Sequence, residues 1–184
     1  MTLKIYAHPF SSYCQKVLIA LYENRTPFSL AMLGPDHAQN FAEFSREWPI
    51  KRMPVLMDGS KPVMESSIII EYLQQHHPGP ARLIPDDADA ALDVRFMDRF
   101  FDNYVMTPIM KFVADRMRPA DKRDPHGVLE AQTLLESSYV WLDSRMNGRE
   151  WAAGDTFSLA DCGAAPFLFY ADWAHRIPAS RRSP

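Results

Sequence analysis

The chain changes character near residue 80, and this change constrains its fold more than any other feature. Residues 1–80 alternate between strand-like and helix-like patterns, whereas the sequence from about residue 86 onward has helical patterns only. Between them, the segment PGPARLIPDDADA (78–90) contains three prolines and is typical of a linker. We therefore predict two domains, a mixed α/β domain over 1–80 and an all-helical domain over 81–184.

The N-terminal part predicts the element order βαβαββα. The apolar run LKIYA (3–7) indicates a buried strand, and from Ser12 the apolar period changes from 2 to 3.6, which indicates a helix. A strand is expected next at 27–33, parallel to the first because a helical crossover joins them. The remaining elements are expected to be a helix at 36–48, an antiparallel hairpin with strands at 54–58 and 61–64, and a helix at 66–77.

The C-terminal part predicts three helices. The first is expected from 88 to about 117, with a kink or break just before Pro108, because proline cannot donate the helical hydrogen bond. The second is expected over 125–146. The third begins at Ser158, where FSLADC predicts a capping box between Ser158 and Asp161.

Composition and charge argue against several functional classes. The formal net charge of -3 gives no support to nucleic-acid binding, and no run approaches the ~18 apolar residues of a membrane span. The two cysteines, Cys14 and Cys162, lie far apart and indicate neither a disulfide framework nor a metal site. The N-terminus enters the strand pattern after one lysine, unlike a signal peptide. We expect a cytoplasmic protein.

The stretch AHPFSSYCQKVLIAL (7–21) places polar residues at the start of the first helix. Ser11 and Ser12 are candidates to cap this helix, which would stabilise it by ~1 kcal/mol. At the same position, a hydroxyl could donate a hydrogen bond to a sulfur and favour its thiolate form, provided that a ligand brings the thiol. Cys14 is a candidate redox thiol in its own right, although it lacks the first Cys of a Cys-x-x-Cys pair.

Two later motifs also have a structural and a functional interpretation. Pro54 can simply begin a strand, or the Met53–Pro54 bond can be cis and present the Met53 backbone to an extended peptide ligand. Glu65 and Ser66 can cap the following helix. Alternatively, the helix N-terminus binds a carboxylate and Glu65 pairs with an ammonium, which suits the α-amino-acid end of a ligand.

Taken in order, these motifs resemble the soluble glutathione S-transferase superfamily over essentially the whole chain. The resemblance rests on FSSYCQKVLIAL, WPIKRMPVL, MESSIIIEYL, the proline-rich linker, the long helices and FSLADC. It is strongest for serine-type members such as the theta and zeta classes. It implies a thioredoxin-like N-terminal domain, an all-α C-terminal domain and a homodimer.

The resemblance also implies roles at the sulfur. Ser11 matches the activating serine of these classes, at the position of the first Cys of a thioredoxin Cys-x-x-Cys motif, and Cys14 stands at the second. Ser12 is the next candidate. Tyr6, at the end of the first strand, is similar to the tyrosine of tyrosine-type members.

The resemblance implies a set of glutathione contacts as well. Met53, before a cis Pro54, would pair with the cysteinyl backbone, and Glu65 with Ser66 would bind the γ-glutamyl end. Two further residues stand where the family contacts the glycyl carboxylate or nearby backbone: Arg52 and Lys51.

The implied activity is conjugation of the glutathione thiolate to small apolar electrophiles, with glutathione as co-substrate and no metal. In the family's arrangement the second substrate would lie between the domains, although each residue that would line its site also suits a helix core. Those residues are Phe101, Tyr104, Met106, Met110 and Phe112.

The sequence departs from the family in two places. Trp48 precedes Pro49, where the family usually has Asn or a small residue. The chain also ends soon after FLFYADWAHRIP, so the C-terminal domain is expected to lack its last helix. Two alternatives therefore stay open: a non-catalytic glutathione-transferase-like binding or regulatory protein, and a glutathione-dependent thiol oxidoreductase that uses Cys14.

Overall fold

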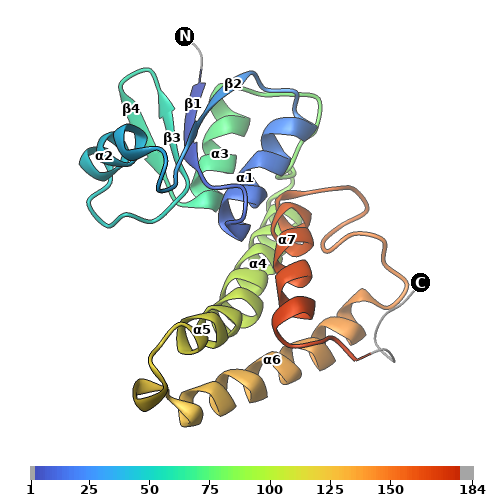
Figure 1. Ribbon diagram of the computed structural model, residues 1–184. Helices are drawn as coiled ribbons and strands as arrows, with labels where there is room; N and C mark the ends of the chain where they lie inside the picture. The colour runs from blue at the N-terminus through green and yellow to red at the C-terminus, as the bar shows by residue number, and fades with distance from the viewer. Residues whose placement is uncertain (1–2, 179–184) are drawn as a thin grey trace. The chain divides into compact units, whose positions relative to one another are not determined.

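A four-stranded mixed sheet with the strand order β2-β1-β3-β4 organises the N-terminal part of the chain (Figure 1). The structure is a computed structural model and describes residues 3–178. β1 pairs in parallel with β2, and β3 pairs antiparallel with both β1 and β4, which confirms the predicted pairings. The strands are β1 (Leu3–Ala7), β2 (Phe28–Met32), β3 (Val55–Asp58) and β4 (Lys61–Met64).

Three helices accompany the sheet: α1 (Ser12–Glu23), α2 (Ala38–Glu47) and α3 (Ser66–His76). α1 and α3 pack against each other (Figure 1). α1 forms where predicted, because its apolar residues recur at helical spacing and are buried, as at Val17 and Leu21. The observed order is the βαβαββα order expected from the sequence.

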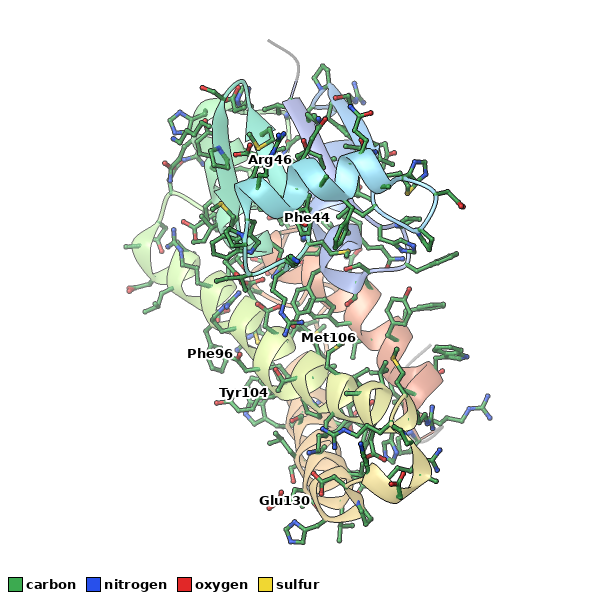
Figure 2. The ribbon with its side chains drawn as sticks, turned by 60° about the vertical axis from the view of Figure 1, so that its left-hand side comes forward. Phe44, Arg46, Phe96, Tyr104, Met106 and Glu130 are labelled. Atoms are coloured by element: carbon green, nitrogen blue, oxygen red, sulfur yellow. The ribbon has the colours of Figure 1, made fainter. Side chains whose placement is uncertain are left out.

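The helix α2, which carries Phe44 and Arg46 (Figure 2), is held to β1 by one carboxylate. Glu43 Oε2 accepts hydrogen bonds from Lys4 Nζ at 2.7 Å and from the Tyr6 hydroxyl at 2.8 Å. The rings of Tyr6 and Phe44 pack with their centroids 6.2 Å apart. The hydrogen bonds from Lys4, Tyr6 and Gln39 lower the pKa of Glu43 from 4.5 to about 2.

The C-terminal part is helical, and by contacts the chain divides into two units between Ala91 and Leu92. None of the helices within residues 3–178 has the length and apolar character needed to cross a membrane. A short 3₁₀ helix at Ala120–Lys122, which the sequence analysis did not predict, precedes α6. The α-helices are α4 (Ala88–Phe100), α5 (Thr107–Arg116), α6 (Pro125–Met146) and α7 (Leu159–Ala174).

The long helix predicted from 88 to about 117 is interrupted by a π-helical segment, Phe101–Met106, between α4 and α5. The Thr107 N–H donates to the Asp102 carbonyl, five residues back, and the Thr107 hydroxyl donates to the same oxygen at 3.0 Å. Pro108 follows at once and has no N–H, so a wider turn accommodates it. The predicted interruption is confirmed, and it takes the form of a π turn.

The capping box at the start of α7 is confirmed. The buried carboxylate of Asp161 accepts hydrogen bonds from the Ser158 N–H and the Ser158 hydroxyl, both at 2.9 Å. Its other oxygen accepts from the Ala152 N–H at 2.8 Å. The Asp161 side chain therefore stabilises the first turn of α7 and also holds the loop that contains Ala152.

We expect Asp161→Ala to destabilise the fold by about 2–4 kcal/mol, because it leaves two buried N–H groups without an acceptor. Urea unfolding, followed by far-UV circular dichroism, measures the change. Asp155→Ala, in the exposed part of the same loop, serves as the control. An equal effect of the two substitutions would contradict the structural role of Asp161.

A second prediction concerns Glu43 and acid stability. Because folding lowers its pKa from 4.5 to about 2, the Glu43 charge stabilises the fold above the higher value, and this contribution is lost as the pH falls through the lower one. The difference in unfolding free energy between wild type and Glu43→Gln should therefore be larger at about pH 7 than at about pH 2. A difference that is constant with pH would contradict this; Glu23→Gln, on the exposed side of α1, is the control.

Candidate functional site

Three of the candidate segments leave the sheet at the same end of its strands. In the strand register, Tyr6 lies opposite Val55, and Val55 lies opposite Met64. β3 begins and β4 ends at this row of residues, and β1 ends one residue beyond it at Ala7, because β3 runs antiparallel to both of its neighbours. The segments 8–12, 51–54 and 65–66 therefore lie at one end of the sheet, which brings the candidate residues together.

Ser11 is the N-cap of α1, and its Oγ accepts a hydrogen bond from the Cys14 N–H at 3.4 Å. The loop before it is held by the Ser11 N–H, which donates to the His8 carbonyl at 3.0 Å. Gln15 Nε2 also donates to the Pro9 carbonyl, at 2.8 Å. An oxygen that accepts at a cap keeps its own hydroxyl proton, so Ser11 is equipped to donate to a ligand.

The other candidates for sulfur chemistry are less accessible. Ser12 is only 5% exposed, whereas Ser11 is partly exposed. The Tyr6 side chain is buried, and its hydroxyl donates to Glu43. Cys14 is fully buried; burial raises the pKa of its thiol, although hydrogen bonds with Ser11 and the His8 backbone partly lower it. A buried thiol with a raised pKa is a poor nucleophile.

The Met53–Pro54 peptide bond is cis, and β3 begins directly after it at Val55. Met53 is partly buried and packs against the core residues around Phe44. Arg52 and Lys51, which precede it, are exposed, and Lys51 has a positive φ of 56°. The backbone of Met53 therefore lies at the edge where Ser11 lies, next to an exposed basic pair.

Glu65 occupies the N-cap position of α3 with φ of 67° and makes no capping hydrogen bond with its side chain. The predicted cap is therefore wrong for this carboxylate, because its left-handed backbone does not bring the carboxylate onto the first turn. Its side chain is exposed, and the following Ser66 is 6% exposed. A non-glycine residue with positive φ is uncommon and is often found at functional sites.

Lys16, which is not among the residues predicted for the site, is fully buried on α1. Its Nζ donates to Ser67 Oγ in the first turn of α3 at 2.9 Å. A signal was available, since Lys16 lies four residues after Ser12, on the helix face that includes the buried Ala20. A cation on such a face is unusual, because lysine is almost never fully buried unless it is paired.

Trp48 ends α2 and packs against the same core residues as Met53. Its Nε1 is buried and has no hydrogen-bond partner among the described residues. Within the C-terminal unit, the residues proposed for the second substrate differ in exposure. Phe101, Met106 and Phe112 are buried. Tyr104 and Met110 are more than 40% exposed.

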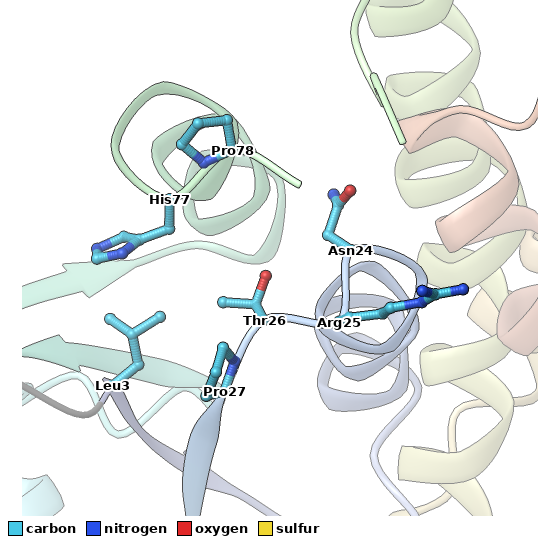
Figure 3. A pocket seen from close by; sticks show the side chains of 7 residues that line it. All are labelled: Leu3, Asn24, Arg25, Thr26, Pro27, His77 and Pro78. Atoms are coloured by element: carbon cyan, nitrogen blue, oxygen red, sulfur yellow. The ribbon is translucent and has the colours of Figure 1, made fainter. Parts of the chain in front are cut away.

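A cavity of about 350 Å³ lies at the opposite end of the strands, next to the start of β1. Figure 3 shows Leu3, Pro27 and His77 around it, together with the turn after α1. His77 Nε2 lies 2.7 Å from Asp58 Oδ2, which also accepts from the Tyr72 hydroxyl at 3.0 Å. None of the residues predicted for the functional site lines this cavity. Within residues 3–178, no group of His, Cys, Asp and Glu is placed to hold a metal ion.

Comparison with known proteins identifies two regions of the chain. Residues 5–81 match the family model "Glutathione S-transferase, N-terminal domain", and residues 112–179 match "Glutathione S-transferase, C-terminal domain". A "Probable glutathione S-transferase" from Nicotiana tabacum is 33% identical over 114 residues, which are 62% of this chain and 47% of that protein. The chain spans about half the length of several of the curated relatives that it matches.

Two further proteins match most of the chain. Glutathione S-transferase theta-1 of Mus musculus is 30% identical, over 92% of this chain and 73% of that protein. A glutathione S-transferase from Methylobacterium radiotolerans, solved in complex with glutathione sulfonate, is 28% identical with a TM-score of 0.81, over 92% and 79% of the two chains. These matches confirm the fold expected from the resemblance, and the chain belongs to the glutathione S-transferase family.

Proposed function

We propose that the protein is a glutathione transferase that conjugates the glutathione thiolate to small apolar electrophiles. One observation carries the proposal: in a member of this family, the strand register brings Ser11, Met53 and Ser66 to one edge of the sheet. These residues offer a hydroxyl, an extended backbone and a helix N-terminus. Glutathione has one group to match each of them: a thiol for the hydroxyl, a cysteinyl backbone for the extended backbone, and a γ-glutamyl carboxylate for the helix N-terminus.

In the proposed complex, glutathione lies extended along this edge. The Met53 backbone pairs with the cysteinyl residue, as in strand addition. The first turn of α3, with the Ser66 hydroxyl, accepts the γ-glutamyl carboxylate, because helix N-termini carry free N–H groups and partial positive charge. The exposed Glu65 carboxylate pairs with the α-ammonium group. Arg52, also exposed, contacts the glycyl carboxylate.

The proposed chemistry depends on the charge of the bound sulfur. The Ser11 hydroxyl donates a hydrogen bond to the sulfur, which favours thiolate over thiol, and the thiol proton passes to solvent. The thiolate then attacks an electrophilic carbon. A carbon–sulfur bond forms, and the leaving group departs with its electron pair. Among the C-terminal residues considered for the electrophile, Tyr104 and Met110 have the most exposed side chains.

We also propose that the protein is a cytoplasmic homodimer, as the family resemblance implies. Cys14 and Cys162 are both free and buried, which suits a reducing compartment. Sedimentation velocity at micromolar concentration should give twice the chain mass of 21.1 kDa. A mass of one chain at every concentration would contradict the dimer.

We expect Ser11→Ala to lower the conjugation rate with a generic chloronitrobenzene by about 10- to 100-fold at saturating glutathione, the loss of one hydrogen bond to a charged sulfur. The pH at which the rate is half-maximal should also rise, because loss of the hydrogen bond to the thiolate raises the pKa of the bound thiol. Ser12→Ala and Cys14→Ala are the matched variants, and both should keep most of the activity.

Other outcomes of that comparison point to the alternatives. Retention on glutathione-agarose without turnover by the wild type would support a non-catalytic binding protein. If only Cys14→Ala abolished activity, and that activity were disulfide reduction, the oxidoreductase would replace the transferase. The burial of Cys14 and the raised pKa of its thiol argue against this last outcome.

We expect Ser66→Ala to raise the KM for glutathione about tenfold with little change in kcat, because it removes a donor to a bound carboxylate far from the sulfur. Initial rates at varied glutathione measure both constants. Ser60→Ala, in the exposed turn between β3 and β4, should leave both unchanged. A tenfold fall in kcat with an unchanged KM for glutathione would place Ser66 outside the binding site.

A further inference from the structure

The Lys16 side chain is among the largest that the structure buries completely. Placing a cationic side chain in a protein interior is costly unless it is hydrogen-bonded or paired. Methionine or leucine would fill similar space without that cost. A lysine at this position therefore calls for an explanation beyond packing, and one of its hydrogen bonds supplies one: Nζ donates to Ser67 Oγ at 2.9 Å.

This hydrogen bond joins the two helices that carry the candidate site. Lys16 lies one turn after Ser12 on the same face of α1, and Ser11 caps that helix. Ser67 directly follows Ser66, the first residue of α3. The bond therefore connects α1 to α3 close to both helix N-termini, near in sequence to the residues assigned to the sulfur and to the γ-glutamyl end.

We propose that Lys16 is a positioning residue for glutathione. By holding the first turn of α3 against α1, it fixes the separation between the Ser11 hydroxyl and the N-terminus of α3, and it places a cation behind the turn that receives the γ-glutamyl carboxylate. This inference rests on the proposed function, since it concerns how that site holds its co-substrate.

A positioning role for Lys16 predicts different effects on two thiol substrates, glutathione and cysteinylglycine. Glutathione reaches both α1 and α3, so its binding depends on their separation. Cysteinylglycine lacks the γ-glutamyl group and does not reach α3, so its reaction depends on Ser11, Met53 and Arg52 but not on the position of α3. A substitution that releases α3 should affect glutathione and spare cysteinylglycine. A substitution that merely weakens the fold should affect both thiols alike.

The test uses the full chain with Lys16→Met, which keeps the apolar length of the side chain, and Lys16→Arg, which keeps a donor. For Lys16→Met, the KM for glutathione should rise about tenfold or more, as for loss of a charge-assisted hydrogen bond, while kcat at saturation stays within about twofold. The kcat/KM for cysteinylglycine should also stay within about twofold. Lys16→Arg should recover part of the affinity for glutathione.

Ser67→Ala is the second variant, since it removes the acceptor and leaves the lysine in place. It should raise the KM for glutathione in the same direction, even if Lys16→Met fails to fold. Lys122→Met, at an exposed position in the C-terminal unit, controls for loss of a lysine and should change neither constant. Thermal unfolding of each variant separates lost binding from lost folding.

The results separate this inference from the function on which it rests. If wild type conjugates glutathione but Lys16→Met and Ser67→Ala leave its KM unchanged, or lower kcat/KM equally for both thiols, the positioning role is wrong and the transferase stands. If wild type neither binds nor conjugates glutathione, the proposed function fails, and the role of Lys16 fails with it.

Discussion

The candidate site depends on the pairing of Tyr6 with Val55 and of Val55 with Met64. At this row β4 ends and β3 begins, and β1 ends one residue beyond it, so three loops that are distant in the sequence meet at one end of the sheet. A shift of one residue would turn Tyr6 to the opposite face of the sheet. The core packing and the hydrogen bond from Tyr6 to Glu43 oppose that shift, because they hold Tyr6 on the α2 side. The packing of this core thus determines where Ser11 and Ser66 lie.

Hydrogen bonds from polar side chains connect several elements. The partly buried Glu43 connects α2 to β1, Lys16 connects α1 to α3, and Asp161 connects the start of α7 to the loop before it. Lys16 and Asp161 are buried, and both have hydrogen-bond partners, as buried polar groups require. Such bonds fix direction as well as distance, which apolar packing alone does less strictly. Trp48 differs, since its buried Nε1 has no partner among the described residues.

Most elements were predictable from local pattern, to within one or two residues, because apolar period and turn residues determine them. The π-helical segment before α5 was not, since proline predicts an interruption without specifying its form. The side-chain cap at Glu65 was wrong because a backbone with positive φ cannot be recognised from a Glu-Ser pair. The helical spacing of α1 places Lys16 on its buried face, but it does not show which partner the lysine has. A lysine at that position can extend to solvent or be buried, and its partner Ser67 lies on another helix, far away in the sequence.

The start of α1 shows how burial distinguishes two kinds of sulfur chemistry. Ser11 and Cys14 are three residues apart, and the Cys14 N–H donates to Ser11 Oγ, so both belong to one capped turn. The helix N-terminus would favour a thiolate at either place. Full burial raises the pKa of the Cys14 thiol, and the cost of desolvation outweighs the hydrogen bonds that lower it. Ser11 is partly exposed and does not need to ionise, since a neutral hydroxyl is already a donor. A fold with this arrangement is better suited to stabilise a thiolate that a ligand brings than to generate one of its own.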